Sequence, residues 1–344
     1  MKIKTTLFYF LLFILLLSSS CKDQSVNSIK TPGALDSVFT LAAQNPNLKC
    51  LIVYKDDHIV KEQYFNSGGP QSPHDVRSVT KSVMATLIGI AIYKGFISSE
   101  DTTIGGYLEP LVGAMDPVKA NIKISHVLSM SAGFSGNELT SPSEYDNWFN
   151  APDQLAYTLH KPMTAAPGTL FTYNSGVAHL TSAVLTQAAG MSTLQFGKQY
   201  LFQPLDMADP SWETDKRGIY NGGAGLRLTP YDMLKIGQLY LNKGVYNGTR
   251  VVSEEWITKA TSLKITTNAQ PFATGYGYYW WLGSIRSHNY FFANGWGGQF
   301  IVVVPDLRLI VVATNIWSGV PASTANAQWY STLDLIMNRI ILLY

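Results

Sequence analysis

Residues 76–95 read VRSVTKSVMATLIGIAIYKG. From Ser78 to Lys94 the stretch contains no proline, and Gly95 follows it, a residue often found just past a helix end. We therefore predict a helix from Ser78 to Lys94. Within it, Ser78 and Lys81 form a Ser-x-x-Lys motif whose spacing puts hydroxyl and ammonium on one face of the helix.

A Ser-x-x-Lys motif suits nucleophilic catalysis. A serine hydroxyl is a poor nucleophile until a neighbour takes its proton, and a lysine in an apolar site can have its pKa lowered enough to be that neighbour. A serine near a helix N-terminus also presents its backbone N–H to a developing oxyanion. Because about one such motif is expected by chance in a chain of this composition, a helix with a surface lysine is the alternative.

Two hairpins are predicted on either side of this helix. The apolar stretches Leu48 to Tyr54 and His58 to Phe65 form the first, and Phe300 to Val304 and Leu309 to Thr314 form the second, with its turn at Pro305. Between them the chain is mainly helical. These patterns predict an α+β fold, with an antiparallel sheet built from both chain ends and a mainly helical inserted subdomain.

One helix of the middle region has a clear beginning. Thr229, Pro230 and Asp232 have the character of an N-cap, a first-turn proline and a first-turn acid. We predict that this helix runs to Gly244.

Composition limits the kind of protein. The chain has 344 residues, of which 46% are hydrophobic and 14% charged, and this suits one large globular domain. The formal net charge is +2, and no Lys/Arg run lies in an aromatic-rich patch. We therefore expect a small-molecule or short-peptide substrate and no nucleic acid.

The first residues predict export. Lys2 and Lys4 precede an apolar run from Leu7 to Leu17, and three serines then lead into Cys21. The run is short for a membrane span, which needs about 20 residues, although a short membrane anchor is the alternative. Small residues before a cysteine also resemble the lipobox of bacterial lipoproteins, which implies a lipid on Cys21.

The predicted organisation follows from that resemblance. Residues 1–20 are a signal peptide, 21–32 a polar tether and 33–344 the folded domain. The protein would be lipid-anchored in the bacterial cell envelope, at the periplasmic face or on the cell surface. Cys50, the other cysteine, lies in an apolar stretch and is expected to be a buried thiol outside any disulfide.

Six landmarks in order resemble the class C β-lactamase-like serine hydrolases, a family that includes DD-peptidases, carboxylesterases, D-aminopeptidases and nylon-oligomer (6-aminohexanoate-dimer) hydrolases. They are VRSVTKSV (76–83), ISHVLSMSAGF (124–134), PGTLFTYNSG (167–176), LFQPLDM (201–207), GAGLRLTPYDMLKIGQLYLNKG (223–244) and FFANGWGGQ (291–299). The resemblance covers nearly all of the expected mature chain. It implies that Ser78 is the nucleophile and Lys81 its partner.

The family's Tyr-x-Asn motif falls on Tyr173, Asn174 and Ser175. The match is partial, because serine occupies the third position and asparagine stands one place early. The resemblance implies that Tyr173 transfers protons, its phenol held near the charged form by two cations or by Lys81. Whether Lys81 or Tyr173 is the general base stays open, and Asn174 and Ser175 are candidate substrate-binding residues.

The family's third motif falls on Gly295 to Gly298, with Trp296 in the position where β-lactamases have lysine. The resemblance implies that Trp296, Gly297 and Gly298 line the substrate site, and that the N–H of Gln299 joins that of Ser78 in an oxyanion hole. A tight turn with a packing tryptophan is the alternative.

Tryptophan at this position bears on the substrate. An indole cannot bind the carboxylate of β-lactams and D-Ala-D-Ala peptides as a lysine does, which favours an uncharged ester or amide, unless Arg227 or Arg286 reaches the site. The aromatic run from Tyr276 to Trp281 could line an acyl pocket, although a buried strand is the simpler interpretation.

Other catalytic classes lack support. The six histidines show no metal-binding spacing, and no G-x-S-x-G elbow occurs. We predict a cofactor-free serine hydrolase that acts through an acyl-enzyme on an ester or amide. The alternatives are a DD-peptidase or β-lactamase-type penicillin-interacting enzyme, and a catalytically silent cell-wall-binding lipoprotein of the same fold.

Overall fold

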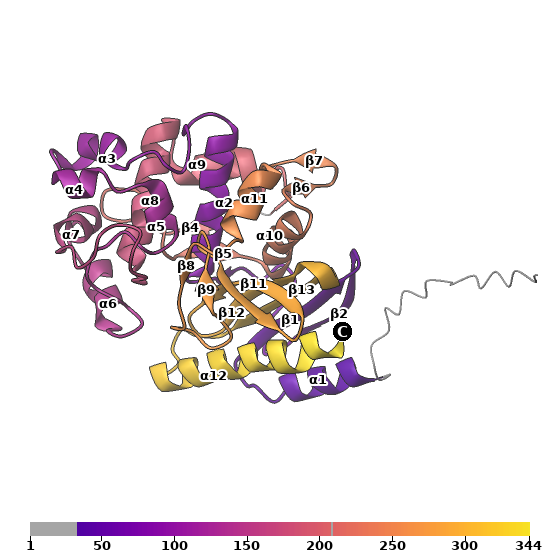
Figure 1. The fold of residues 1–344 in the computed structure, drawn as a ribbon. Helices are drawn as coiled ribbons and strands as arrows, with labels where there is room; N and C mark the ends of the chain where they lie inside the picture. Colours follow the sequence, from indigo (N-terminus) through magenta and orange to yellow (C-terminus); the bar gives the residue numbers. More distant parts are fainter. Residues whose placement is uncertain (1–32, 208) are drawn as a thin grey trace, which may run out of the picture.

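The computed structural model describes residues 33–207 and 209–344. The predicted signal peptide, the tether and Cys21 lie outside these residues. An eight-stranded antiparallel sheet forms the centre of the described part (Figure 1). Its strands are β1 (Leu48–Lys55), β2 (His58–Tyr64), β8 (Ile265–Thr266), β9 (Gly275–Tyr276), β10 (Trp281–Ile285), β11 (His288–Gly295), β12 (Gln299–Val304) and β13 (Leu309–Asn315).

The sheet joins the two ends of the described chain. Its strand order is β2-β1-β13-β12-β11-β10-β9-β8, and Leu51 of β1 pairs with Ala313 of β13. Both predicted hairpins are present, because β1 pairs with β2 and β12 with β13. Every residue of β12 and β13 is buried, as expected for strands covered on both faces.

Helices cover the sheet on both faces (Figure 1). On one face lie α1 (Ala34–Ala42) and α12 (Ala322–Leu335), which contact each other. On the other lie α2 (Val79–Tyr93), α10 (Pro230–Leu241) and α11 (Glu254–Ala260). The predicted α+β class is therefore confirmed.

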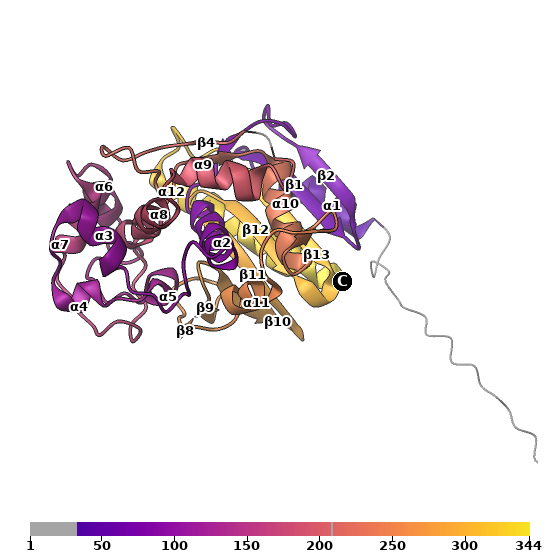
Figure 2. The same ribbon diagram turned by 90° about the horizontal axis from the view of Figure 1, so that it is seen from above.

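Most of the remaining helices gather at one side of the sheet, beyond α2, whereas α9 lies beside α2 (Figure 2). The remaining helices are α3 (Gly105–Val112), α4 (Pro117–Ala120), α5 (Ile124–Leu128), α6 (Ser143–Phe149), α7 (Gln154–His160), α8 (Ser175–Ala189) and α9 (Thr193–Gly197). Short strands pair nearby as β3 (His74–Asp75) with β5 (Leu226–Leu228) and β4 (Ser211–Trp212), and as β6 (Val245–Tyr246) with β7 (Thr249–Arg250). None of the described helices is long and apolar enough to span a membrane.

Helix α2 is the central element between the sheet and the helical region. It is buried on all sides from Val79 to Ala91, which is the pattern of a core helix. A glycine is needed at Gly89, because a Cβ there would lie 2.1 Å from the indole nitrogen of Trp256. That nitrogen donates to the carbonyl of Ala85 at 3.0 Å, so α2 is fixed in place by direct backbone contact.

The other local predictions hold with one change. Thr229 caps α10 and exchanges hydrogen bonds with Asp232, but the helix ends at Leu241, before the predicted Gly244. The chain turns out of the helix at Lys243, which has a φ of 51°. Cys50 is fully buried, and burial raises the pKa of its thiol.

Candidate active site

Ser78 stands at the N-cap of α2 with its hydroxyl free of any capping bond. Its Oγ lies 2.9 Å from Nζ of Lys81, one helical turn further on. The structure therefore brings the two residues of the Ser-x-x-Lys motif into direct contact. Because the hydroxyl is not used to cap the helix, it is available for reaction.

Lys81 is a buried amine without a carboxylate in direct contact. It is 1% exposed, and its Nζ bonds Ser78 Oγ and Ser175 Oγ at 2.9 Å each and the carbonyl of Gly223 at 2.8 Å. Burial lowers the pKa of Lys81 to about 7; the charge of Glu138 opposes this change, and that of Arg77 adds to it. Burial therefore favours the neutral amine, the form that is able to accept a proton.

Tyr173 lies beside the same amine. Its ring is buried, stacks on Trp281 with centroids 5.8 Å apart, and has its centroid 4.9 Å from Nζ of Lys81. Burial raises the pKa of Tyr173, while a hydrogen bond with Ser78 and the charge of Arg77 lower it by less. The expectation of a phenol held near its charged form is wrong for this resting site, because desolvation outweighs the neighbouring cations. The raised pKa keeps the Tyr173 phenol protonated, whereas burial lowers the pKa of the neighbouring Lys81.

Asn174 and Ser175 have different surroundings. Asn174 caps α8: its Oδ1 accepts from the backbone N–H of Val177 at 2.9 Å, and its Nδ2 donates to the carbonyl of Gly136 at 2.7 Å. Ser175, the first residue of α8, contacts Lys81. The third position of the Tyr-x-Asn motif is thus brought to Lys81, and the second position caps the helix.

Glu138 is a site residue that the sequence analysis missed. Its carboxylate accepts hydrogen bonds from the backbone N–H of Ser175 and from Ser175 Oγ, the latter at 2.8 Å. Burial raises the pKa of Glu138 above its usual range, because Lys81 and the bonds from Ser175 lower it by less. No sequence signal marks Glu138, because it lies in a loop far along the chain from its partners.

Arg77 was also missed, although it directly precedes Ser78. It has a φ of 50°, a left-handed conformation that is uncommon for arginine, and its N–H donates to Asp75 Oδ1 at 2.8 Å. Its guanidinium carbon lies 4.4, 5.1 and 6.0 Å from the ring centroids of Trp317, Tyr145 and Trp296. The Asp-x-Arg spacing, typical of an Asx turn, is the local signal that could have drawn attention to it.

This arginine corrects the reasoning on charge. A cation does lie near Trp296, as the sequence analysis allowed, but it comes from a residue other than the two arginines named there. Arg227 donates to the carbonyl of Pro73 at 3.4 Å. Arg286 follows β10, at the far end of β11 from Gly295 and about 25 Å along the strand. The cation beside Trp296 is Arg77.

The glycine turn after β11 has the tight backbone that its sequence predicts. Gly297 and Gly298 have φ of 76° and 98°, and a Cβ on them would lie 2.5 Å from Trp317 and 2.6 Å from Asn315. A Cβ on Gly295 would lie 2.4 Å from the carbonyl of Val76, two residues before the nucleophile. The turn therefore packs against the segment that leads into α2.

Trp296 and Gln299 lie at the two ends of this turn. Trp296 is 36% exposed, and its Nε1 donates to Asn326 Oδ1 at 3.0 Å. The side chain of Gln299 is fully buried and bonds the backbone N–H and carbonyl of Asn315. That anchoring leaves only the main chain of Gln299 for a role in the site.

A buried pair of His179 and Asp215 fixes the backbone beside Gly223, whose carbonyl accepts from Lys81. The N–H of Gly222 donates to His179 Nδ1 at 3.2 Å, and Nε2 of His179 lies 3.0 Å from Asp215 Oδ2. Because Nδ1 accepts, Nε2 carries the proton that His179 donates to Asp215. The pair fixes the backbone next to Gly223 and does not touch Ser78.

The aromatic run from Tyr276 to Trp281 is buried, and Trp281 supports Tyr173. Within residues 33–207 and 209–344, no cluster of His, Cys, Asp or Glu could hold a metal ion.

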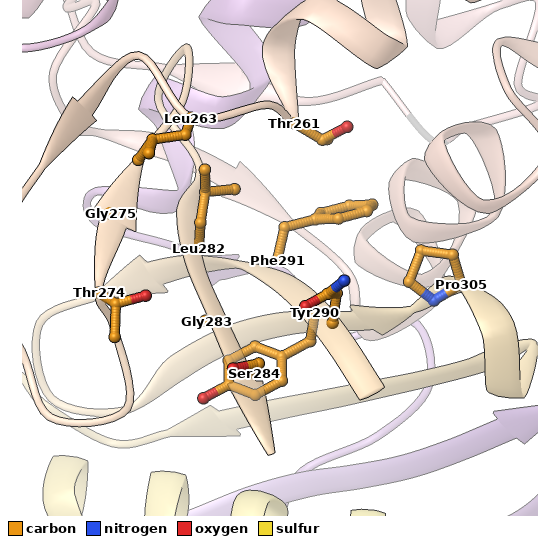
Figure 3. Close-up of a pocket in the computed structure, with 11 residues that line it drawn as sticks. Thr261, Leu263, Thr274, Gly275, Leu282, Gly283, Ser284, Tyr290, Phe291 and Pro305 are labelled. Carbon is orange, nitrogen blue, oxygen red and sulfur yellow. The ribbon is translucent and has the colours of Figure 1, made fainter. Parts of the chain in front are cut away.

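Two hollows lie outside the contacts of Ser78. One of about 440 Å³ opens beside β9, β10 and β11 (Figure 3). It is lined by Thr261, Leu263, Thr274, Gly275, Leu282, Gly283, Ser284, Asn289, Tyr290, Phe291 and Pro305. The other, of about 350 Å³, includes Arg227 and shares Asp75 and Trp317 with the surroundings of Arg77. None of the predicted catalytic residues lines either hollow.

Known proteins are similar to this chain in sequence or in fold. The 6-aminohexanoate-dimer hydrolase of Paenarthrobacter ureafaciens is 23% identical over 289 residues, which are 77% of this chain and 72% of that protein. The penicillin-binding protein homologue from Pyrococcus abyssi has a TM-score of 0.69 at 19% identity, over 90% of this chain and 78% of its own. EstCE1, a hydrolase with promiscuous acyltransferase activity, has a TM-score of 0.67 at 17% identity, over 87% and 98%.

These structural likenesses show a shared fold. A family model described as Beta-lactamase matches residues 49–330, which run from β1 into α12. The resemblance drawn from the six sequence landmarks is thereby confirmed, and the chain belongs to the beta-lactamase family.

Proposed function

We propose that the protein hydrolyses an ester or amide through an acyl-enzyme on Ser78, with Lys81 as the general base and Tyr173 as the proton donor to the leaving group. The contact that carries the proposal is the 2.9 Å bond between Ser78 Oγ and the buried amine of Lys81. The related 6-aminohexanoate-dimer hydrolase and EstCE1 support hydrolysis of amide or ester bonds.

The first chemical step is acylation. The lone pair of neutral Lys81 accepts the proton of Ser78 while Oγ attacks the carbonyl carbon of the substrate. The negative charge that develops on the carbonyl oxygen is placed between the N–H groups of Ser78 and Gln299. The glycine turn that packs against the segment before Ser78 supports this oxyanion site.

The bond to the leaving group then breaks. Tyr173 gives its proton to the departing amine or alkoxide and regains a proton from the Lys81 ammonium, which returns the amine to its neutral form. In the second half of the cycle, neutral Lys81 takes a proton from the water molecule that attacks the acyl carbon, and Ser78 Oγ leaves with that proton. Trp296, Gly297 and Gly298 would line the substrate beside the nucleophile.

Arg77 supports a second candidate, a penicillin-interacting enzyme. Its guanidinium lies beside Trp296, where β-lactamases have a lysine, and it could pair with a substrate carboxylate. Asp75 lies 3.8 Å away and offsets part of that charge. A catalytically silent binding protein is less well supported, because Ser175 fills the altered motif position with a contact to Lys81.

A substrate panel tests both candidates. Short-chain nitrophenyl esters, short amide oligomers, a chromogenic cephalosporin and D-amino-acid amides would be compared on wild type and Ser78→Ala. We expect turnover of esters or amides that Ser78→Ala abolishes. Faster turnover of the cephalosporin than of any ester would favour the second candidate, and full activity in Ser78→Ala would contradict both.

We further propose that the protein is exported and anchored in the membrane through a lipid on Cys21, on the basis of the lipobox-like sequence alone. Expression in a bacterium, followed by membrane fractionation and mass analysis of the N-terminal peptide, tests this. We expect a lipid-modified Cys21 in the membrane fraction and a shift to the soluble fraction for Cys21→Ser. An unmodified Cys21 within an intact leader would contradict it.

A further inference from the structure

Lys81 connects Ser78 to a chain of hydrogen bonds that continues to Ser175 and Glu138. Lys81 Nζ lies 2.9 Å from Ser175 Oγ, and Ser175 Oγ lies 2.8 Å from Glu138 Oε2. The backbone N–H of Ser175 donates to the other oxygen of Glu138. Ser78, Lys81, Ser175 and Glu138 thus form one continuous array.

The donors and acceptors available in this array fix which group donates in each hydrogen bond. A carboxylate can only accept, so the single hydroxyl proton of Ser175 points to Glu138, and Ser175 Oγ must accept from Lys81. The carbonyl of Gly223 also accepts from Lys81, at 2.8 Å. A neutral amine has two N–H groups, and both are then used. Its lone pair is left facing Ser78 Oγ, the atom that must lose a proton.

Protonation of Glu138 would remove the order of donors and acceptors that leaves the lone pair of Lys81 facing Ser78. A carboxylic acid can donate to Ser175, whose hydroxyl proton is then free to turn toward the lone pair of Lys81. Ser78 would lose its proton acceptor. Two features favour the carboxylate form: its bonds from Ser175, and its place at the N-terminus of the fifteen-residue helix α8.

We propose that Glu138 is a positioning residue of the catalytic reaction, acting through Ser175 to aim the lone pair of Lys81 at Ser78. This inference rests on the proposed function of Ser78 and Lys81. When Lys81 takes the proton of Ser78, its third N–H points at the serine oxygen, and its new positive charge faces the carboxylate across one hydroxyl group. No proton has to reach Glu138, so the step balances within Ser78 and Lys81.

Other charged groups act on the same array and enter the pH dependence. Arg77 acts on Lys81 with the opposite sign to Glu138, and the phenol of Tyr173 lies against the amine. Glu144 lies near Glu138 and raises the pKa of its carboxyl group, and Glu144 is itself paired with Lys161. Removing the charge of Glu138 should therefore lower the pKa of Lys81, because the ammonium loses its nearest anion.

The test compares Glu138→Gln, Ser175→Ala and the double variant by the pH dependence of kcat/KM on a nitrophenyl ester. We expect each single variant to lose about 10²-fold in kcat/KM at neutral pH, as for a group that orients a catalytic base. The acid limb of the profile is the rise of kcat/KM with pH as Lys81 loses its proton. It should move down by about one pH unit in Glu138→Gln. The double variant should be no more than about threefold slower than the slower single variant, because both changes cut one chain.

Two further variants separate positioning from folding. Glu138→Asp keeps the charge, so its acid limb should stay at the wild-type pH even if the rate falls. Glu144→Gln removes a neighbouring carboxylate that does not bond Ser175, and it should keep both rate and acid limb near wild type. Thermal unfolding of every variant shows which of them are folded.

The outcomes also distinguish this inference from the proposed function. If wild type forms no covalent adduct on Ser78 with a fluorophosphonate, the proposed function fails. If wild type forms the adduct but Glu138→Gln keeps the wild-type rate and acid limb, only the role of Glu138 is overturned. Single effects that multiply in the double variant would overturn it as well.

Discussion

Lys81 has unlike neighbours on its two flanks. On one flank the guanidinium of Arg77 is surrounded by Tyr145, Trp296 and Trp317, and it is 18% exposed. On the other flank Glu138 is reached through a single hydroxyl group. Arg77 lowers the pKa of Lys81 and Glu138 raises it, while burial has the largest effect. Burial therefore sets the low pKa of Lys81, and the charges of Arg77 and Glu138 act on it in opposite directions.

The two flanks also differ in how they are built. Arg77 is held by a local turn, through the bond from its backbone N–H to Asp75. Glu138 depends on tertiary structure, because its loop must meet the start of α8. Changes of the Arg77 side chain should therefore leave the hydrogen bonds of Lys81 in place, whereas changes at Glu138 should alter both the charge near the amine and its geometry.

Removing the amine of Lys81 should have the largest effect on kcat/KM, because Arg77 and Glu138 both act through that amine. Lys81→Met keeps a buried apolar chain and should lower kcat/KM on a nitrophenyl ester by about 10⁴-fold. The acid limb near pH 7 should vanish with it. A Lys81→Met variant that retained that limb would assign it to another group.

Removing the phenol should have the next largest effect and should depend on the leaving group. Tyr173→Phe should lower kcat by about 10²-fold on an amide, whose departing amine needs a proton. The loss should be much smaller on a nitrophenyl ester, because nitrophenolate leaves unprotonated. Steady-state kinetics on a matched ester and amide measure the difference, and equal losses on both would show that Tyr173 is not the proton donor.

Removing the cation of Arg77 should move the acid limb in the direction opposite to the shift expected for Glu138→Gln. Arg77→Met should raise the pKa of Lys81, because the ammonium loses a repelling neighbour, and should move the acid limb up by about half a pH unit. Arg77→Lys should hold it near wild type. Arg227→Met, which changes a cation in the adjoining hollow, is the matched control. Shifts in the same direction for Arg77→Met and Glu138→Gln would break the comparison.

The smallest effect on catalysis is expected from a change at Asn174, the neighbour of Ser175. Asn174→Ala removes the cap of α8 and should reduce the free energy of unfolding by about 1–2 kcal/mol. Its acid limb should stay at the wild-type pH, because Asn174 contacts neither Lys81 nor Glu138 in the structure. Thermal melts and the pH profile of this variant and Ser175→Ala would separate the helix cap from the proton chain.

Local patterns predicted much of the fold. Apolar stretches marked β1, β2, β12 and β13, and the capping residues Thr229 and Asp232 marked the start of α10. The motif spacing within one helical turn likewise predicted the contact of Ser78 with Lys81. Each of these features depends on residues that are close in sequence, or on burial that a short window shows.

The rest of the site depended on contacts between distant segments. Glu138 lies in a loop without any pattern, and only the packing of that loop against α8 brings it to Ser175. The raised pKa of Tyr173 follows from burial against Trp281, which no motif shows. Even Arg77, adjacent to Ser78, acquires its surroundings from Tyr145, Trp296 and Trp317, which come from separate parts of the chain.

The most direct test of the central claim is covalent labelling of the protein with a fluorophosphonate, followed by intact-mass measurement and peptide mapping, beside Ser78→Ala and Lys81→Met. The account predicts one adduct on Ser78 in wild type, none in Ser78→Ala and strongly slowed labelling in Lys81→Met. An adduct on another residue, or labelling of Ser78→Ala at the wild-type rate, would contradict it.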